Sequence, residues 1–231
     1  GLLPTVANAN ATDDLRGDLH WKVKDPQFGE ALFDFYRGDN FSAITRLTLA
    51  QETRALVSQE QEGDLLLGML YLTSNMPNEA QKVFSRLIKD SDPSSLSDIA
   101  RLYSAKILYS QGAYPAAEKL LSAIEDLPGG LREKQNVLLA NLLMEKKQFQ
   151  KAETLLLRLD NDSKQGYYSR HNLAVNMLKD GISLQGTGLL VVISKEIFSD
   201  PEMKMLQDKV NLALGYHYLQ QKEPGLAKVY F

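Results

Sequence analysis

The side chains that could do chemistry in this sequence are few, and the histidines come first. They are His20, His171 and His217, and they stand far apart in the chain. A zinc site or a general base needs a second histidine or a carboxylate nearby, usually three or four residues away on a helix. None of the three has such a neighbour. We therefore expect no metal site, and we expect His171 and His217 to be partly exposed side chains on helices.

Other motifs for cofactors or nucleophiles are equally weak. The stretch Gly186-Thr187-Gly188 comes nearest to a phosphate-binding loop, but no strand precedes it, as such a loop requires. The acidic residues Asp13, Asp14 and Asp18 fit a solvated segment better than a metal site. Neither G-x-S-x-G nor a P-loop occurs. The sequence therefore predicts no enzyme and no cofactor.

The composition is that of an ordinary globular chain and excludes several functions. Of the 231 residues, 44% are hydrophobic and 24% are charged, and the formal net charge is −3. Nucleic-acid binding normally needs a basic face, so we expect no nucleic-acid partner. The chain has no cysteine, which excludes disulfides, thiolate metal sites and cysteine nucleophiles. No apolar run reaches the roughly eighteen residues of a membrane-spanning helix, so we expect no direct span.

The first residues differ from the rest of the chain. The stretch GLLPTVANANA is uncharged and ends just before Thr12-Asp13-Asp14. Ala9 and Ala11 fit the A-x-A places of a signal-peptide cleavage site. The alternative is a weakly apolar tail without a targeting role. We therefore expect a leader over 1–24 and a periplasmic or otherwise exported protein, with a cytoplasmic location as the alternative.

An internal repeat follows the leader. In two segments a glycine is followed after 3, 12 and 16 positions by a tyrosine, an alanine and a phenylalanine. These residues are Gly68, Tyr71, Ala80 and Phe84, then Gly215, Tyr218, Ala227 and Phe231. The same frame fits Ala105, Leu108, Ala117 and Leu121, and Ala140, Leu143, Ala152 and Leu156. Weaker copies are Leu32, Phe35, Ile44 and Thr48, and Ala174, Met177, Gly186 and Leu190. Successive copies begin 34 to 41 residues apart.

This frame resembles the tetratricopeptide repeat (TPR), in which each repeat of about 34 residues is a pair of antiparallel helices, A and B. The small residue in helix A lets helix B approach closely, and the small residue in helix B admits the next repeat. No segment alternates with the period of two that strands need. The resemblance implies an all-α, right-handed α-solenoid of about six repeats.

Turn-forming residues divide the chain between these copies. Asp90-Ser91-Asp92-Pro93 and Leu127-Pro128-Gly129-Gly130 are breakers between repeats. We expect the solenoid over 25–231, with repeats near 25–60, 61–97, 98–130, 131–164, 165–200 and 205–231. The last copy stops at the large apolar residue of its helix B, which predicts a C-terminally incomplete array that lacks a polar capping helix.

The TPR resemblance also implies a binding surface, the concave groove lined by helix-A residues. Carrying the frame over residue by residue predicts a mostly apolar groove with Tyr and Met side chains, which suits a partner helix or an apolar peptide. The alternative is that single members pack against neighbouring helices or against C-terminal repeats that the array lacks. The predicted groove residues are Phe33, Tyr36, Met69, Leu72, Leu102, Lys106, Tyr109, Asn141, Met144, His171, Val175, Leu178, Tyr216 and Leu219.

Two functions are compatible with these features. The first is a non-catalytic protein–protein interaction scaffold that binds a partner peptide or helix in the groove, within a cell-envelope assembly if the leader is a signal peptide. The second is a substrate-recruiting, non-catalytic region of a larger enzyme or of a transport or secretion machine. Self-association through the uncapped ends of the solenoid is a third arrangement that the sequence allows.

Overall fold

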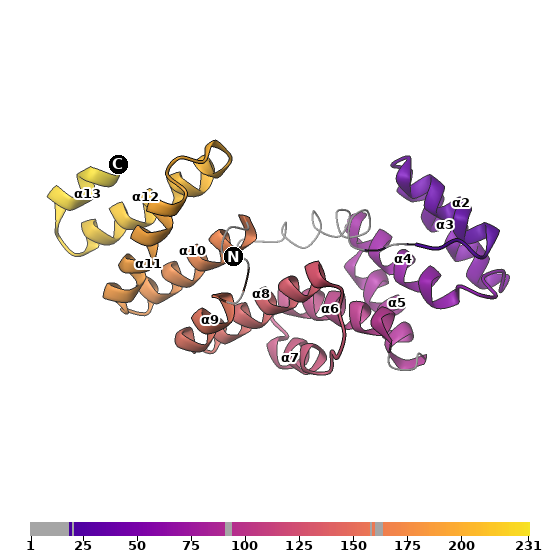
Figure 1. Ribbon diagram of the computed structural model, residues 1–231. Coiled ribbons are helices and arrows are strands. Elements are labelled where there is room, and N and C mark those ends of the chain that lie inside the picture. The colour runs from indigo at the N-terminus through magenta and orange to yellow at the C-terminus, as the bar shows by residue number, and fades with distance from the viewer. Residues whose placement is uncertain (1–18, 20, 91–93, 158, 160–163) are drawn as a thin grey trace. The chain divides into compact units, whose positions relative to one another are not determined.

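The computed structural model describes residues 19, 21–90, 94–157, 159 and 164–231, and within them it contains helices and no strand (Figure 1). The helices are α2 (Pro26–Tyr36), α3 (Asn40–Glu52), α4 (Glu60–Thr73), α5 (Pro77–Asp90), α6 (Ser95–Ser110), α7 (Tyr114–Ser122), α8 (Gly129–Glu145), α9 (Phe149–Leu156), α10 (Lys164–Lys179), α11 (Ser183–Glu196), the 3-10 helix η1 (Pro201–Met203), α12 (Lys204–Gln220) and α13 (Pro224–Tyr230). The prediction of an all-α fold is confirmed. Ala9, Ala11, His20, Pro93 and the acidic residues near the N-terminus lie outside the described residues.

The chain divides into two compact units, 1–135 and 136–231, and α8 begins in the first and ends in the second. In the first unit each helix from α2 to α7 packs against the next, and α4 also packs against α6. In the second unit α9, α10, α11, α12 and α13 pack in the same consecutive way, and α10 also packs against α12. Each unit is therefore a stack of helix pairs, in which α4 and α10 contact both their own partner helix and the first helix of the next pair.

One backbone turn recurs inside all six described pairs. Each turn holds one residue with φ between +58° and +84°. The next residue donates its N–H, over 2.8 to 2.9 Å, to the carbonyl oxygen five residues earlier. This bond closes the first helix and sends the chain back antiparallel. The positive-φ residues are Gly38, Asn75, Gly112, Lys147, Gly181 and Lys222.

These turns correct the register of the first pair. In the other five pairs, the small residues of the two helices stand seven positions before and five positions after the positive-φ residue. In the first pair, counting from Gly38 gives Ala31 and Ala43, and both are fully buried. The sequence prediction of Leu32 and Ile44 is therefore wrong by one residue.

The one-residue error in the predicted register has a physical reason: the Asp34 carboxylate occupies a position where the repeat normally has an apolar side chain. Asp34 occupies the position that is Tyr71 in the second pair, and its side chain is only 10% exposed. The Arg46 guanidinium on α3 donates to Asp34 at 2.5 Å and to Glu30 at 2.6 Å, which satisfies the buried charge. A buried carboxylate with such a partner is tolerated where an aromatic ring is expected.

Small residues sit at the helix crossings as the frame predicts. Gly68, Ala105, Ala140 and Gly215 are buried. A Cβ atom on Gly68 would overlap the ring of Phe84, which is itself fully buried. A Cβ atom on Gly215 would lie 2.7 Å from Cζ of Phe231, a ring that is 64% exposed. Both glycines therefore admit a ring from the second helix of the pair.

The N-terminal segment of the first unit is fastened through its backbone. Gln59, which precedes α4, is 1% exposed. Its Oε1 accepts the backbone N–H groups of Lys24 at 2.6 Å and Asp25 at 3.0 Å, and its Nε2 donates to the carbonyl of Lys22 at 2.7 Å. The Asp25 carboxylate accepts the backbone N–H of Ser58 at 2.8 Å. One amide side chain therefore holds the segment that leads into α2.

Candidate interaction surface

Three predicted groove residues of the first unit are buried. Met69 and Leu102 have no exposed area, and Leu72 is 3% exposed. They lie on α4 and α6, which pack against each other. A partner on the surface of the unit could not contact these side chains without rearrangement of the helices. Their assignment to the groove stays a prediction.

Lys106 and Tyr109, also on α6, are partly covered. The ammonium nitrogen of Lys106 is buried and has no hydrogen-bond partner in the described part of the chain. It lies 4.9 Å from the centroid of the Tyr103 ring, a cation–π contact. Burial lowers the pKa of Lys106 to about 8, because removal from water disfavours the charged form. Tyr109 packs against Tyr114, with 5.3 Å between their ring centroids.

Phe33 and Tyr36 on α2 are open, with exposed fractions of 61% and 51%. The Arg37 guanidinium lies 5.4 Å from the Phe33 ring centroid. The corrected register shows that neither residue is equivalent to Met69 or Leu72. The equivalent residues are Leu32 and Phe35, which are 5% and 0% exposed. At corresponding places the first unit therefore presents mainly covered side chains.

In the second unit, the predicted residues of α8 and α10 are half-buried or buried. Asn141, Val175 and Leu178 are half-buried. Met144 is 7% exposed, and it accepts a long contact of 3.8 Å from the Asn176 side-chain amide through its sulfur. These side chains leave only part of their surface accessible.

The predicted residues of α12 are about half exposed, and two further exposed apolar residues lie on the same helix. Tyr216 is 57% and Leu219 47% exposed, and their assignment to the groove stays a prediction. Leu212, 49% exposed, and Met205, 66% exposed, lie on the same face of the helix but are absent from the predicted set. Leu212 is the equivalent of Leu102, so the repeat frame contained the signal for it. We call Met205, Leu212, Tyr216 and Leu219 the α12 stripe.

The α12 stripe is the second apolar face of its helix. Leu206, Val210 and Leu214 have no exposed area and pack in the core of the second unit with residues of α10 and α11. Helical geometry at 100° per residue puts the stripe nearly opposite this buried face. A helix that is apolar on both sides is normally buried on both sides. In the described part of the chain the Tyr216 ring meets the Phe231 ring edge-on, with 5.7 Å between their centroids. The stripe as a whole is an apolar face that stays about half exposed to solvent.

Polar groups border this stripe where α12 meets α10. Lys209 lies with its ammonium nitrogen 5.2 Å from the Tyr168 ring centroid. His171 on α10 is 9% exposed, and its Nδ1 lies 3.4 Å from Oδ1 of Asn172. Burial is the main cause that lowers the pKa of His171; the Asn172 side chain and the Lys209 backbone act in the opposite direction, and the Lys209 charge adds to the lowering. His171 is thus held neutral inside the unit.

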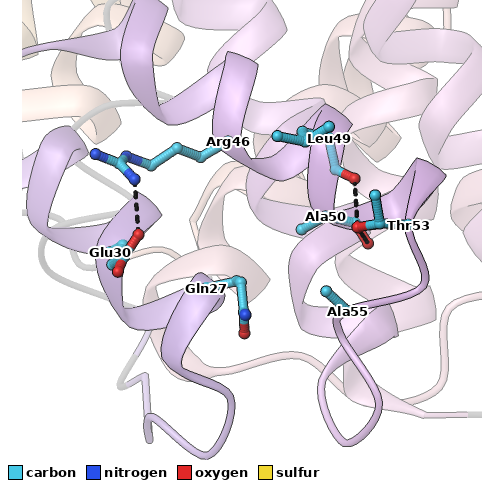
Figure 2. Close-up of a pocket in the computed structure, with 7 residues that line it drawn as sticks. All are labelled: Gln27, Glu30, Arg46, Leu49, Ala50, Thr53 and Ala55. Atoms are coloured by element: carbon cyan, nitrogen blue, oxygen red, sulfur yellow. Dashed lines mark hydrogen bonds and ion pairs between the residues drawn. The ribbon is translucent and has the colours of Figure 1, made fainter.

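A pocket of about 250 Å³ lies between α2 and α3 in the first unit (Figure 2). The residues that line it are Gln27, Glu30, Arg46, Leu49, Ala50, Thr53 and Ala55. Arg46 reaches Glu30, and the Thr53 hydroxyl donates to the Leu49 carbonyl at 2.8 Å. The Arg46 guanidinium, the cationic group of this pocket, is therefore paired with the carboxylates of Glu30 and Asp34.

Within the described ranges, no cluster of three or more histidine or carboxylate side chains could hold a metal ion. The same residues contain no helix with the length and apolar character that crossing a membrane requires. Neither observation adds a site to the surface described above.

Comparison with known proteins gives matches among solved structures. No family model and no curated protein matches the chain. Among solved structures, the chain is similar to a candidate kinesin light chain from Podosopora anserina with nearly identical TPR-like repeats. The TM-score is 0.55 and the identity 18%, and the match covers 74% of this chain and 95% of the other. The chain has a TPR-like repeat fold. At this identity the likeness shows the fold alone, and TPR-like repeats are typically binding rather than catalytic elements.

Proposed function

We propose that this TPR-like chain is a non-catalytic scaffold that binds a segment of a partner protein, and that α12 forms the accessible part of its binding face. The observation that carries the proposal is the α12 stripe. Its four apolar side chains are each about half exposed or more. Exposed apolar residues scattered singly need no explanation, whereas a contiguous set marks an interaction site. Aromatic and Met side chains on such a face supply adaptable contacts.

The other predicted groove residues are expected to contribute less to partner contact than α12 does. Val175 and Leu178 on α10 and Asn141 on α8 are partly accessible members of the predicted groove. Phe33 and Tyr36 form a separate exposed aromatic pair on the first unit. We assign direct partner contact first to α12, because burial limits what the others can offer.

The experiment is a capture assay with matched variants. The double variant Leu212→Ser with Tyr216→Ser should recover at least about tenfold less partner from host fractions than the parent, because it removes two apolar anchors. The control is Leu184→Ser with Val192→Ser on α11, which are 83% and 46% exposed and lie outside the stripe. Circular dichroism should show equal helix content for all three proteins. Equal recovery by the stripe variant and the parent would reject the assignment.

We also propose that the protein is exported, on the support of the A-x-A pattern at Ala9 and Ala11. The test is fractionation of host cells with an antibody to the chain. Recovery in the envelope or periplasmic fraction is the expected outcome, and recovery with a cytoplasmic marker would refute export.

A further inference from the structure

The α12 stripe has the geometry of a helix-packing seam. Counting from Met205, its members follow after 7, 11 and 14 residues. With a rise of 1.5 Å per residue, the stripe is about 21 Å long. Such spacing forms a ridge that packs into the grooves of another helix. On its buried side α12 uses a ridge of residues four positions apart, Leu206, Val210 and Leu214, toward the core.

An extended peptide fits this face less well. An extended chain needs partners for its own backbone N–H and C=O groups, usually at the edge of a sheet. The described residues contain no strand, and the backbone groups along α12 bond within the helix. A partner helix satisfies its backbone internally and brings only side chains to the interface. The face therefore favours a helical ligand.

The charged side chains beside the stripe favour a ligand of negative charge. Lys204 and Asp208 form an ion pair of 2.7 Å, so each already has a counter-charge. Lys209 is exposed, rests over the Tyr168 ring and has no ion-pair partner in the described part of the chain. The neighbouring His171 is neutral because burial lowers its pKa, so it offers no competing positive charge. A carboxylate on the ligand would form an ion pair with the Lys209 ammonium group.

We propose that the α12 stripe docks an amphipathic α-helix of a partner protein, with an acidic side chain of that helix opposite Lys209. This inference rests on the proposed binding function and specifies its ligand. The apolar seam supplies the affinity, since burial of Leu and Tyr side chains is the main favourable term. The Lys209 contact sets orientation and charge preference more than it sets affinity.

The test uses a synthetic helix as the probe. It is a labelled peptide of about 18 residues, enough to cover the stripe, with leucines three and four positions apart and glutamates beside them. A second peptide carries lysines in place of the glutamates, and a third has the composition of the first with two central prolines. Fluorescence anisotropy against the full chain should give saturable binding of the glutamate peptide and at least about tenfold weaker binding of the other two.

Variants of the chain separate the two parts of the proposal. Leu212→Ser with Tyr216→Ser should weaken binding of the glutamate peptide at least about tenfold, and Leu184→Ser with Val192→Ser should leave it unchanged. Lys209→Glu should reverse the preference, so that the lysine peptide binds more tightly than the glutamate peptide. A charge reversal of this kind is not expected from unfolding.

The failing outcomes are distinct. Equal binding of the proline peptide, or an unchanged charge preference in Lys209→Glu, would overturn the helical, acidic ligand. If no helical probe binds but partner capture still depends on Leu212 and Tyr216, this inference fails and the proposed function stands. If capture is independent of the stripe, both fail. Concentration-dependent dimer mass that disappears in the stripe variant would identify a second copy of the chain as the occupant and overturn the proposed partner.

Discussion

The two units use the same turn and similar small residues, yet α2 and α4 of the first unit and α12 of the second differ in exposure at equivalent helix-A positions. In the first unit Leu32, Phe35, Met69 and Leu72 are all 5% exposed or less. In the second unit their equivalents on α12, Tyr216 and Leu219, are about half exposed. The repeat frame thus determines how helices pack within a pair, whereas the accessibility of a groove position depends on what packs over it.

The glycine contacts show the same contrast. Gly68 faces a fully buried ring, Phe84, whereas Gly215 faces Phe231, which is 64% exposed. The first ring is surrounded by other side chains, including Tyr103 in a stacked arrangement with 6.1 Å between ring centroids. The second ring has solvent on one side. The two equivalent glycine positions therefore differ in how easily the facing ring can move aside for an added side-chain atom.

The largest expected effect tests what the two units have in common. Ala117→Arg in the first unit and Ala174→Arg in the second should each lower the free energy of unfolding by about 4 kcal/mol or more, because an arginine enters a fully packed crossing. The matched control is Ala116→Arg, at an exposed position beside Ala117. Chemical denaturation measures the change, and parental stability in Ala117→Arg would contradict the packing described for α7.

The next effect should separate the units. Gly68→Ala is expected to cost about 1–3 kcal/mol, because the new methyl group overpacks against Phe84, which has no room to move. Gly215→Ala should be near neutral, since Phe231 can turn into solvent and alanine favours the helix by about 1 kcal/mol. Thermal unfolding of both variants checks the comparison. Equal losses would show that the two rings are held equally tightly.

A third comparison concerns the pH dependence of stability that the two buried basic side chains, Lys106 and His171, produce. The Lys106 pKa of about 8 lies below its ordinary value of 10.5. Between these two values the unfolded chain binds the proton and the folded chain does not, so stability rises with pH over that range. Lys106→Met removes the cost of the buried charge and should stabilise the first unit at pH 7 by about 1–3 kcal/mol. The stability difference between variant and parent should shrink as pH rises from about 8 toward 10.5.

In the second unit the corresponding group is His171, whose pKa is lowered from 6.5. As pH falls below 6.5 the unfolded chain takes up a proton that the folded chain resists, so stability is lost. His171→Gln should remove this part of the pH dependence between pH 7 and 5, measured by denaturation at each pH. An identical acid dependence in parent and variant would mean that His171 is not buried in the neutral form.

The smallest effect concerns the turns. Lys222 adopts φ +61°, a conformation that costs a side-chain-bearing residue about 1 kcal/mol and costs glycine little. Lys222→Gly should therefore stabilise the second unit by up to about 1 kcal/mol, while Lys222→Ala should not. In the first unit Gly112→Ala, at φ +76°, should lose a similar amount. Differential scanning calorimetry can resolve these shifts, and a gain in Lys222→Ala would refute the backbone explanation.

The sequence predicted the helix pairs because their determinants are local. Gly68, Ala105, Ala140 and Gly215 recur with the repeat and are buried as expected. The first pair was misplaced by one residue, because Asp34 stands where an apolar residue is expected and its partner Arg46 could not be inferred from spacing.

Site accessibility was harder to predict. A side chain at a groove position can be covered by a neighbouring helix that the repeat frame does not include, as Met69 is, or left open, as Tyr216 is. Leu212 is absent from the predicted groove although its place is equivalent to Leu102, since the predicted set includes this helix-A position in only two copies, at Leu102 and His171. The burial of the Lys106 ammonium group depends on tertiary packing and leaves no sequence signal.

The hydrogen bonds between Gln59 and the N-terminal segment have a consequence for which substitutions the chain can tolerate. Within the described residues its amide bonds to main-chain atoms: the carbonyl of Lys22, which every residue type has, and the N–H groups of Lys24 and Asp25, which every type except proline has. Side chains at 22 and 24 are therefore free to drift among related chains, whereas position 59 can accept few replacements. A glutamate there would have the right shape but would lose the N–H that reaches the carbonyl of Lys22.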